Sequence, residues 1–196
     1  MTFRRLLSDP NGASAAEFAL VLPLLLLVMF GIIDVGRYMW SINRAEKAAQ
    51  MGVRMAIVTE YVSSDIGDDY VGQCSTPLGA GDPIPPECFS QITCSRTGNS
   101  ASCTSGTANT VAFNRVLERM QLFLPELQPS SAQIIYSPSG LGYAGDPSGP
   151  DVAPLVTVRL SGVTFRPIIL LALVNVGLPE VRSSLTFEDG AGAQSN

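Results

Sequence analysis

An apolar segment near the N-terminus constrains the fold more than any other feature of the sequence. No charged residue lies between Leu20 and Ile33, and Glu17 is the only charge between Ala13 and Ile33. A helix of residues 13–33 would reach roughly 31 Å, which matches a bilayer hydrocarbon core of about 30 Å. The segment 13–34 is therefore predicted to be a transmembrane helix.

This segment is expected to remain in the protein. A basic start at Arg4 and Arg5 before an apolar run is also typical of a cleaved secretory signal. However, the charged and bulky stretch from Asp34 to Trp40 offers no small-x-small cleavage site. The later apolar run from Ile168 to Leu178 has only about half the length needed to cross a membrane.

The charges and the cysteines favour a cytoplasmic N-terminus. Arg4 and Arg5 precede the segment, and basic residues next to a span favour the cytoplasmic side. Arg37, Arg44 and Lys47 follow the segment and weaken this preference. All four cysteines lie beyond it, and disulfides persist in oxidising compartments, so the C-terminal part is expected outside the cytoplasm.

The composition argues against several functions. The net charge is −5, which makes the chain a poor binder of nucleic acid. The chain has no histidine, and therefore lacks the commonest general base and the commonest nitrogen ligand of metals. We expect no catalytic residue, no metal and no cofactor. Beyond the predicted helix, roughly 130 residues remain, enough for one small core.

The sequence from Asn11 to Pro23 is the most informative motif. A short basic leader ends at Gly12, and an apolar helix follows with Glu17 at its fifth position after the glycine. This arrangement looks like a class III signal of prepilins. Together with the stretch from Gly31 to Arg37, the motif resembles the TadE-like family of Tad pilus minor pilins (pseudopilins), over about forty residues from Gly12 to near Met55.

The resemblance implies processing and assembly. An aspartic prepilin peptidase would cleave after Gly12 and leave Ala13 as the new N-terminus, while Glu17 and Phe18 would contact a neighbouring subunit. The implied partners are other pilin and minor pilin subunits, the prepilin peptidase, the inner-membrane pilus assembly platform and the lipid bilayer. The implied location is the bacterial inner membrane, crossed once, with a periplasmic C-terminal domain that can enter the extracellular pilus.

The position of Glu17 has a physical rationale of its own. An acid near the start of a spanning helix is costly unless it is paired or held at the interface. The amine of Ala13 on an adjacent subunit is one suitable partner. Alternatively, Glu17 is solvated at headgroup depth, where a helix N-terminus already favours a carboxylate.

Pro23 lies inside the apolar run and frees the carbonyl of Ala19 from its helical hydrogen bond. A kink there could help the helix leave the bilayer and pack into a filament. The alternative is that Pro23 has no such role, because membrane helices tolerate proline routinely.

Helical periodicity continues over residues 35–60, which are predicted to extend the helix beyond the membrane. Apolar and small residues recur with 3-4 spacing along one face: Val35, Tyr38, Ile42, Ala45, Ala49, Gly52 and Ala56. The small residues after Ile42 allow another backbone or a sheet to approach closely. Arg37, Arg44, Lys47 and Arg54 form the opposite face, interpreted as solvated, with a contact for acidic partners or lipid headgroups as the alternative.

Residues 61–109 are predicted to be an irregular, cysteine-containing loop region rich in glycine, proline and small polar residues. Its cysteines are Cys74, Cys88, Cys94 and Cys103. Two disulfides are expected, because so polar a segment has little core to hold it, and the pairs Cys74–Cys88 and Cys94–Cys103 are favoured among the three possible connectivities. A zinc site of four thiolates is the less favoured alternative. Asp65, Asp68 and Asp69 lack the spacing of a calcium-binding EF-hand.

Residues 110–196 are predicted to form a small α+β domain. Residues 111–124 have the pattern of an amphipathic helix, and strands are expected at 132–136, 152–160 and 181–187. Residues 168–176 fit either a buried helical turn or a strand. The fold class is therefore α+β: a long transmembrane and spine helix, followed by a small pilin-like domain with an antiparallel sheet and a disulfide-bearing loop.

Residues 140–145 spell G-x-G-x-x-G, the fingerprint of dinucleotide-binding sites. That motif requires a helix directly after it, to hold the pyrophosphate. The sequence from Asp146 to Pro150 contains two prolines and does not continue as a helix. We therefore expect a loop between strands.

Three functions are compatible with these features of the sequence. The favoured one is a structural minor pilin, needed for pilus assembly, surface attachment or related secretion. The second is an uncleaved, single-pass, membrane-anchored binding or adhesion protein. The third, an exported enzyme, has the least support because the sequence has no histidine and no G-x-S-x-G motif.

Overall fold

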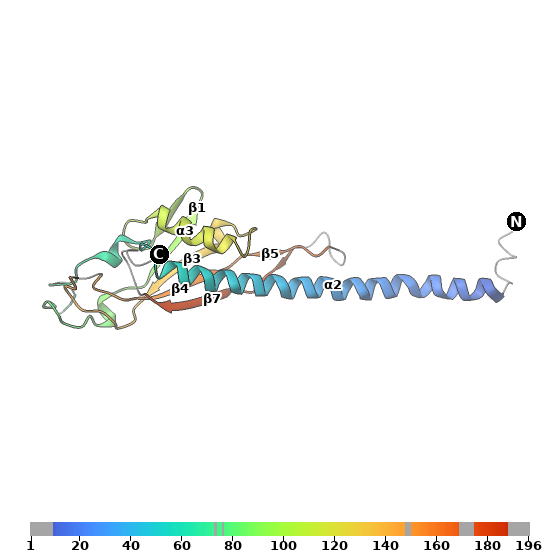
Figure 1. Cartoon of the computed structure of the whole chain (residues 1–196), viewed down its shortest axis with the longest axis horizontal. Helices are drawn as coiled ribbons and strands as arrows, with labels where there is room; N and C mark the ends of the chain where they lie inside the picture. Colours follow the sequence, from blue (N-terminus) through green and yellow to red (C-terminus); the bar gives the residue numbers. More distant parts are fainter. Residues whose placement is uncertain (1–9, 73, 76, 148–149, 169–174, 188–196) are drawn as a thin grey trace. The chain divides into compact units, whose positions relative to one another are not determined.

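The computed structural model describes residues 10–72, 74–75, 77–147, 150–168 and 175–187 (Figure 1). Within these residues, two α-helices and seven strands follow one another, with short 3-10 turns at Ser64–Gly67, Pro86–Cys88 and Pro129–Ser131. These elements are α2 (Pro10–Ala56), β1 (Ile92–Thr97), β2 (Ser100–Cys103), α3 (Thr110–Gln121), β3 (Ala132–Ser137), β4 (Leu155–Leu160), β5 (Thr164–Phe165), β6 (Val176–Gly177) and β7 (Val181–Thr186).

The chain divides into two compact units. The first contains residues Met1–Ser41 and Thr164–Gly177, and thus the first part of α2 together with the β5–β6 pair. The second contains Ile42–Val163 and Leu178–Asn196, with the last turns of α2, helix α3 and the main sheet.

Helix α2 confirms the predicted long N-terminal helix. It has 47 residues, starts at Pro10 and continues through Pro23. At the other end, the Thr59 hydroxyl donates to the carbonyl of Met55 over 2.8 Å, which satisfies one of the last carbonyls of the helix.

The second unit is built on a five-stranded antiparallel sheet in the order β2-β1-β3-β4-β7. Burial alternates along β3 and β4, as expected of a sheet with one face on the core and one toward water. The core face presents Ile134, Tyr136, Val156 and Val158, each at most 1% exposed.

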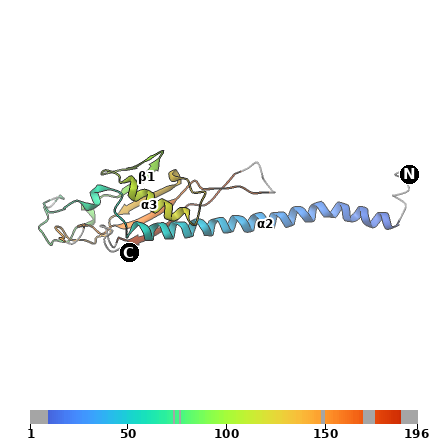
Figure 2. The same cartoon turned by 45° about the horizontal axis from the view of Figure 1, so that its top comes forward.

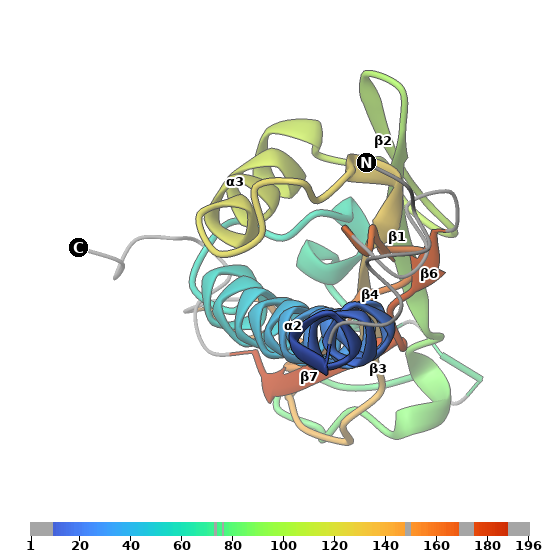
Figure 3. The same cartoon turned by 90° about the vertical axis from the view of Figure 1, so that its right-hand side faces the viewer.

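Both helices cover the same face of this sheet (Figures 2 and 3). Helix α3 is capped by the Asn109 side chain, which accepts from the N–H groups of Val111 and Ala112. The buried residues of α2 in this unit are mostly small: Ala45, Ala48, Ala49, Gly52, Val53 and Ala56. A Cβ atom at Gly52 would clash with the end of the Met120 side chain, so a side chain there would force Met120 to move.

The prediction of an irregular region over residues 61–109 was wrong for its last part. Strands β1 and β2 form a hairpin with Cys94 directly opposite Cys103. The turn between Thr97 and Ser100 has only two residues, and Gly98 supplies a φ of +67° that other residues rarely adopt. The hairpin holds because the Cys94–Cys103 disulfide crosses it and Cys94 is fully buried.

Both disulfides connect nearest neighbours in the sequence. Cys74 is bonded to Cys88 and Cys94 to Cys103, which is the favoured pairing. All four cysteines are therefore oxidised and do not form the alternative zinc site.

The remaining predicted elements are confirmed, with shifted ends. The predicted helix 111–124 is Thr110–Gln121, and the strands predicted at 132–136, 152–160 and 181–187 are β3, β4 and β7. Strand β4 begins only at Leu155, and Val152 instead pairs with Gly142 in an isolated bridge. Of the ambiguous segment 168–176, residues 169–174 lie outside the described residues, and Val176 belongs to β6.

Tyr136 generates a stability prediction. Its hydroxyl is fully buried and accepts the N–H of Val62 over 3.1 Å. Removing the hydroxyl with Tyr136→Phe leaves that N–H buried without an acceptor, which costs about 1–3 kcal/mol. We expect the free energy of unfolding of the full chain in detergent, followed by circular dichroism, to fall by this amount. The matched variant Tyr143→Phe alters a side chain that is 60% exposed and should have little effect, and equal stability of both variants would contradict the assigned bond.

Candidate functional site

The first part of α2 exposes a long row of large apolar side chains. Eleven of them, between Phe18 and Ile33, are at least 37% exposed: Phe18, Leu20, Val21, Leu22, Leu24, Leu25, Leu27, Val28, Met29, Ile32 and Ile33. An apolar surface of this size marks a contact with lipid or with other proteins. Among the described residues, α2 is the one helix long and apolar enough to cross a membrane. It fits a single-pass membrane anchor.

The predicted processing and pairing residues lie together at the start of α2. Gly12 and Ala13 fall in its first turns, and Glu17 is exposed one turn further on. Residues 13 and 17 have i,i+4 spacing, so they lie about one turn apart along the helix. Phe18 is 66% exposed, next to Glu17. The helix therefore presents a carboxylate on the same face as the residue predicted to become the N-terminus.

A buried acid that the sequence analysis missed lies at the end of the apolar segment. Asp34 is 5% exposed, and its Oδ1 accepts from the Ile168 N–H over 3.1 Å and from Arg37 Nη1 over 3.2 Å. The 3-4 spacing placed Val35 on the same helix face as the buried small residues, yet Val35 is 58% exposed. The amphipathic pattern could not reveal Asp34, because its partner Ile168 lies far along the sequence.

The β5–β6 pair contacts α2 at Arg37 and Tyr38, just after Asp34. The rings of Tyr38 and Phe165 meet edge to face with centroids 5.6 Å apart, and the Arg37 guanidinium lies 5.2 Å from the Phe165 ring centre. The Tyr38 hydroxyl donates to the carbonyl of Gly177 over 3.3 Å. Contacts of this kind are worth about 0.5–1.5 kcal/mol each. Together with Asp34 they attach the hairpin to the helix where the apolar segment ends.

Arg44 was interpreted as part of a solvated face, and this was wrong. Its Nε donates to the carbonyl of Phe123 over 3.0 Å, and its two terminal nitrogens bind both carboxylate oxygens of Glu126. The planar guanidinium suits this two-point contact. Lys47 and Arg54, on the same face, are exposed as predicted. Arg44 thus fastens the last turns of α2 to the segment after α3.

The G-x-G-x-x-G sequence is a loop between β3 and β4, as predicted. The N–H groups of Gly145 and Asp146 donate to the Asp151 carboxylate over 2.8 and 2.9 Å, and the N–H of Tyr70 donates over 2.7 Å. Backbone donors that could hold a phosphate are thus occupied by a carboxylate of the same chain. Burial tends to raise the pKa of Asp151, but these three hydrogen bonds outweigh it and hold the pKa below its usual value.

The acids Asp65 and Asp68 line a groove of about 240 Å³ together with Tyr70. Asp65 is already bound, since the hydroxyls of Ser64 and Ser105 hydrogen-bond its two carboxylate oxygens. Burial, together with the nearby charges of Asp68, Asp65 and Asp151, raises the pKa of Tyr70 to about 12. The hydrogen bonds from Ser64 and Ser105 therefore make Asp65 part of the loop structure.

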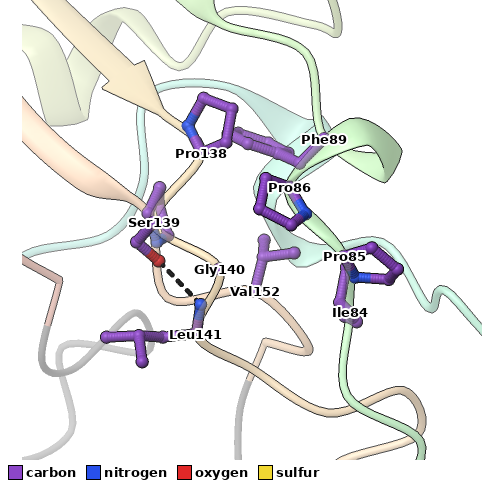
Figure 4. A pocket seen from close by; sticks show the side chains of 10 residues that line it. Ile84, Pro85, Pro86, Phe89, Pro138, Ser139, Gly140, Leu141 and Val152 are labelled. Atoms are coloured by element: carbon purple, nitrogen blue, oxygen red, sulfur yellow. Dashed lines mark hydrogen bonds between the residues drawn. The ribbon is translucent and has the colours of Figure 1, made fainter.

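A second hollow lies beside the G-x-G-x-x-G loop (Figure 4). Proline side chains and Phe89 line it, and the Ser139 hydroxyl accepts the N–H of Leu141 over 3.0 Å. Its volume of about 10 Å³ leaves room for no more than a single water molecule. This hollow therefore does not hold a substrate or a cofactor.

Comparison with known proteins supports the resemblance of the N-terminal part. The model of the family described as TadE-like protein matches residues 12–54. This match confirms the resemblance stated from the motif. The matched residues cover the first part of α2 and the stretch from Asp34 to Tyr38 that contacts the β5–β6 pair. They also include most of the small buried residues in the last turns of α2. No curated protein and no solved structure matches the chain.

Asp151 generates a pH-dependent prediction. Because its pKa is lower in the folded state, its contribution to stability is complete above its ordinary pKa of 3.8 and is lost as the pH falls below that value. The variant Asp151→Asn should unfold about 1.5–3 kcal/mol more easily at neutral pH, the range for hydrogen bonds to charged groups. The difference from the unchanged chain should shrink below pH 3.8 in thermal unfolding experiments.

The matched variant Asp68→Asn changes an exposed acid of the same loop region and should leave the unfolding transition almost unchanged. An Asp151→Asn chain that is as stable as Asp68→Asn at neutral pH would contradict the role given to the carboxylate.

Proposed function

We propose, from the match of residues 12–54 to the TadE-like family, that this chain is a minor pilin (pseudopilin) of a Tad-type pilus. In this proposal it is a structural subunit that is cleaved after Gly12, held in the bacterial inner membrane by α2, and assembled with other pilin and minor pilin subunits. Its role is in pilus assembly, surface attachment or related secretion.

The observation that carries the proposal is the position of Glu17. It is the only charge between Ala13 and Ile33, and it lies one helical turn after the residue that would become the N-terminus. No hydrogen bond or ion pair joins Glu17 to another residue in the part of the chain that the structure describes. A carboxylate at the edge of an apolar helix is costly without a partner, and the amine of a neighbouring subunit would supply one.

The two disulfides support the proposed topology. Disulfides persist in the periplasm and are rare in the cytoplasm. Placing the second unit in the periplasm puts Cys74, Cys88, Cys94 and Cys103 in an oxidising compartment. The N-terminus is then cytoplasmic, where the prepilin peptidase acts and where the assembly platform would take up the processed chain.

The seam of small residues in the last turns of α2 also supports a pilin-like subunit. A spine helix must carry its own domain without broad side chains between them, and Ala45, Ala49 and Gly52 allow this close packing. The apolar first part of α2 remains available for lipid before assembly and for neighbouring helices afterwards.

Processing after Gly12 is the first test. Replacement of Gly12 by phenylalanine should block the peptidase, because the site must accept a small residue, and the full-length form should accumulate in the membrane. Intact mass spectrometry of the purified protein measures this directly: the unchanged chain should begin at Ala13. The matched variant Gly36→Phe adds the same side chain to the same helix, where nothing lies within 4 Å of a Cβ, and should be processed normally.

A mature, unchanged protein that still begins at Met1, in cells with an active prepilin peptidase, would contradict the pilin proposal. The uncleaved membrane-anchored binding protein would then be the better description.

The role of Glu17 is the second test. Glu17→Gln keeps the shape of the side chain and removes its charge, so the second unit should fold and the membrane span should insert as before. If the carboxylate pairs with an amine in the desolvated helix bundle, loss of one partner costs about 3–5 kcal/mol, and piliation should be lost. Electron microscopy and shearing of surface pili from cells with this single copy measure the effect.

The matched variant Glu46→Gln removes an exposed charge from the same helix outside the apolar segment, and piliation should persist. Normal piliation with Glu17→Gln would reject the pairing and leave the solvated carboxylate as the explanation. Cleavage after Gly12 in that variant would show that processing and pairing are separate.

A further inference from the structure

The β5–β6 hairpin follows α2 back toward the apolar segment. Its open end is held at Tyr38, through the Phe165 ring and the Gly177 carbonyl. Three residues after Phe165, the N–H of Ile168 is bonded to Asp34, one turn earlier on the helix. As the chain leaves β5, its contacts thus move from Tyr38 to Asp34, toward the segment that is free of charge.

The hairpin presents apolar surface where it reaches Asp34. The Ile168 side chain is 62% exposed although its backbone is fixed by Asp34. In the sequence, every residue from Ile169 to Val174 is also apolar. Exposure of a large apolar side chain to water costs about 1.5–3 kcal/mol relative to its burial, so the Ile168 side chain is expected to be covered.

The residues around this contact are those found at the level of lipid headgroups. Trp40 is 65% exposed and Tyr38 is partly exposed, and both residue types are enriched at membrane interfaces. Arg37 lies beside Phe165, and Arg166 Nε donates to Asn175 Oδ1 over 3.1 Å within the hairpin. Arginine at this depth can place its charge among the headgroups and its stem against apolar surface.

We infer that the β5–β6 hairpin is a second membrane-contact element, which places the exposed Ile168 side chain in the lipid interface beside α2. Lipid is the occupant because the Asp34–Ile168 bond fixes Ile168 at the end of the span, where the bilayer surrounding the span already lies. The inference rests on the membrane anchor of the proposed function and does not depend on pilus assembly.

Tryptophan fluorescence tests this contact, because Trp40 is the only tryptophan in the chain. In a Trp40→Phe background, one tryptophan is introduced by Ile168→Trp, Ile32→Trp or Leu122→Trp. The full chain is reconstituted in vesicles of phosphatidylcholine with acyl chains brominated near the headgroup, which quench nearby tryptophan. The replaced residues are similarly exposed, at 62%, 69% and 68%.

We expect the Ile168→Trp protein to lose as large a fraction of its emission as the unchanged protein does through Trp40, with a shift to shorter wavelength. Leu122→Trp, in the second unit, should keep most of its emission. An Ile168→Trp protein that behaves like Leu122→Trp would overturn the inference. A second result would also overturn the inference: the Ile168→Trp protein emits at short wavelength, is not quenched by the lipid, and changes its emission with the protein-to-lipid ratio. That result would indicate a second copy of the chain as the occupant.

The Ile32→Trp protein separates this inference from the membrane anchor. Strong quenching of Ile32→Trp without quenching of Ile168→Trp rejects the hairpin contact alone. Failure of Ile32→Trp to be quenched rejects the membrane span as well. Retention of the circular dichroism unfolding transition in all three variants shows that the comparison is made on folded protein.

Discussion

The structure depends on one continuous helix that serves two different environments. In its first part α2 exposes large side chains such as Leu24 and Ile32, whereas in its last turns it buries small ones such as Ala49 and Gly52. Large exposed apolar residues suit lipid or neighbouring helices, and small buried ones let the sheet and α3 approach the backbone. The change from large to small along one helix therefore decides which part of the chain can lie in a membrane and which part carries the domain.

Glu17 and Asp34, the acids at the two ends of the apolar segment, differ in their surroundings. Asp34 is buried and bonded within its own chain, to the Ile168 N–H and to Arg37. Glu17 is exposed at the other end of the apolar segment. An internal partner makes Asp34 a structural residue that holds the β5–β6 hairpin. Glu17, in contrast, makes no hydrogen bond or ion pair within the described residues, and this asymmetry is the reason for proposing a role in assembly for Glu17.

The sequence predicted the elements whose patterns are local and missed those fixed by distant partners. Helix α3 and strands β3, β4 and β7 show clear periodicity, and the motif around Glu17 led to the TadE-like family. The β1–β2 hairpin was missed because its strands consist largely of serine and threonine, and only the Cys94–Cys103 bond and the buried face of β1 explain its order. Asp34 was missed and Arg44 was misplaced because their partners, Ile168 and Glu126, lie far from them in sequence.

The loops of the second unit satisfy their polar groups internally. Asp151 accepts three backbone N–H groups from two loops, the hydroxyls of Ser64 and Ser105 occupy Asp65, and the Tyr136 hydroxyl accepts from Val62. Buried polar networks of this kind, when fully bonded, specify one loop arrangement rather than a ligand site. The longest row of exposed large apolar side chains among the described residues lies on the first part of α2, between Phe18 and Ile33. An exposed apolar helix with one carboxylate near its start is suited to association within a membrane. This property is consistent with the proposed role of a pilus subunit.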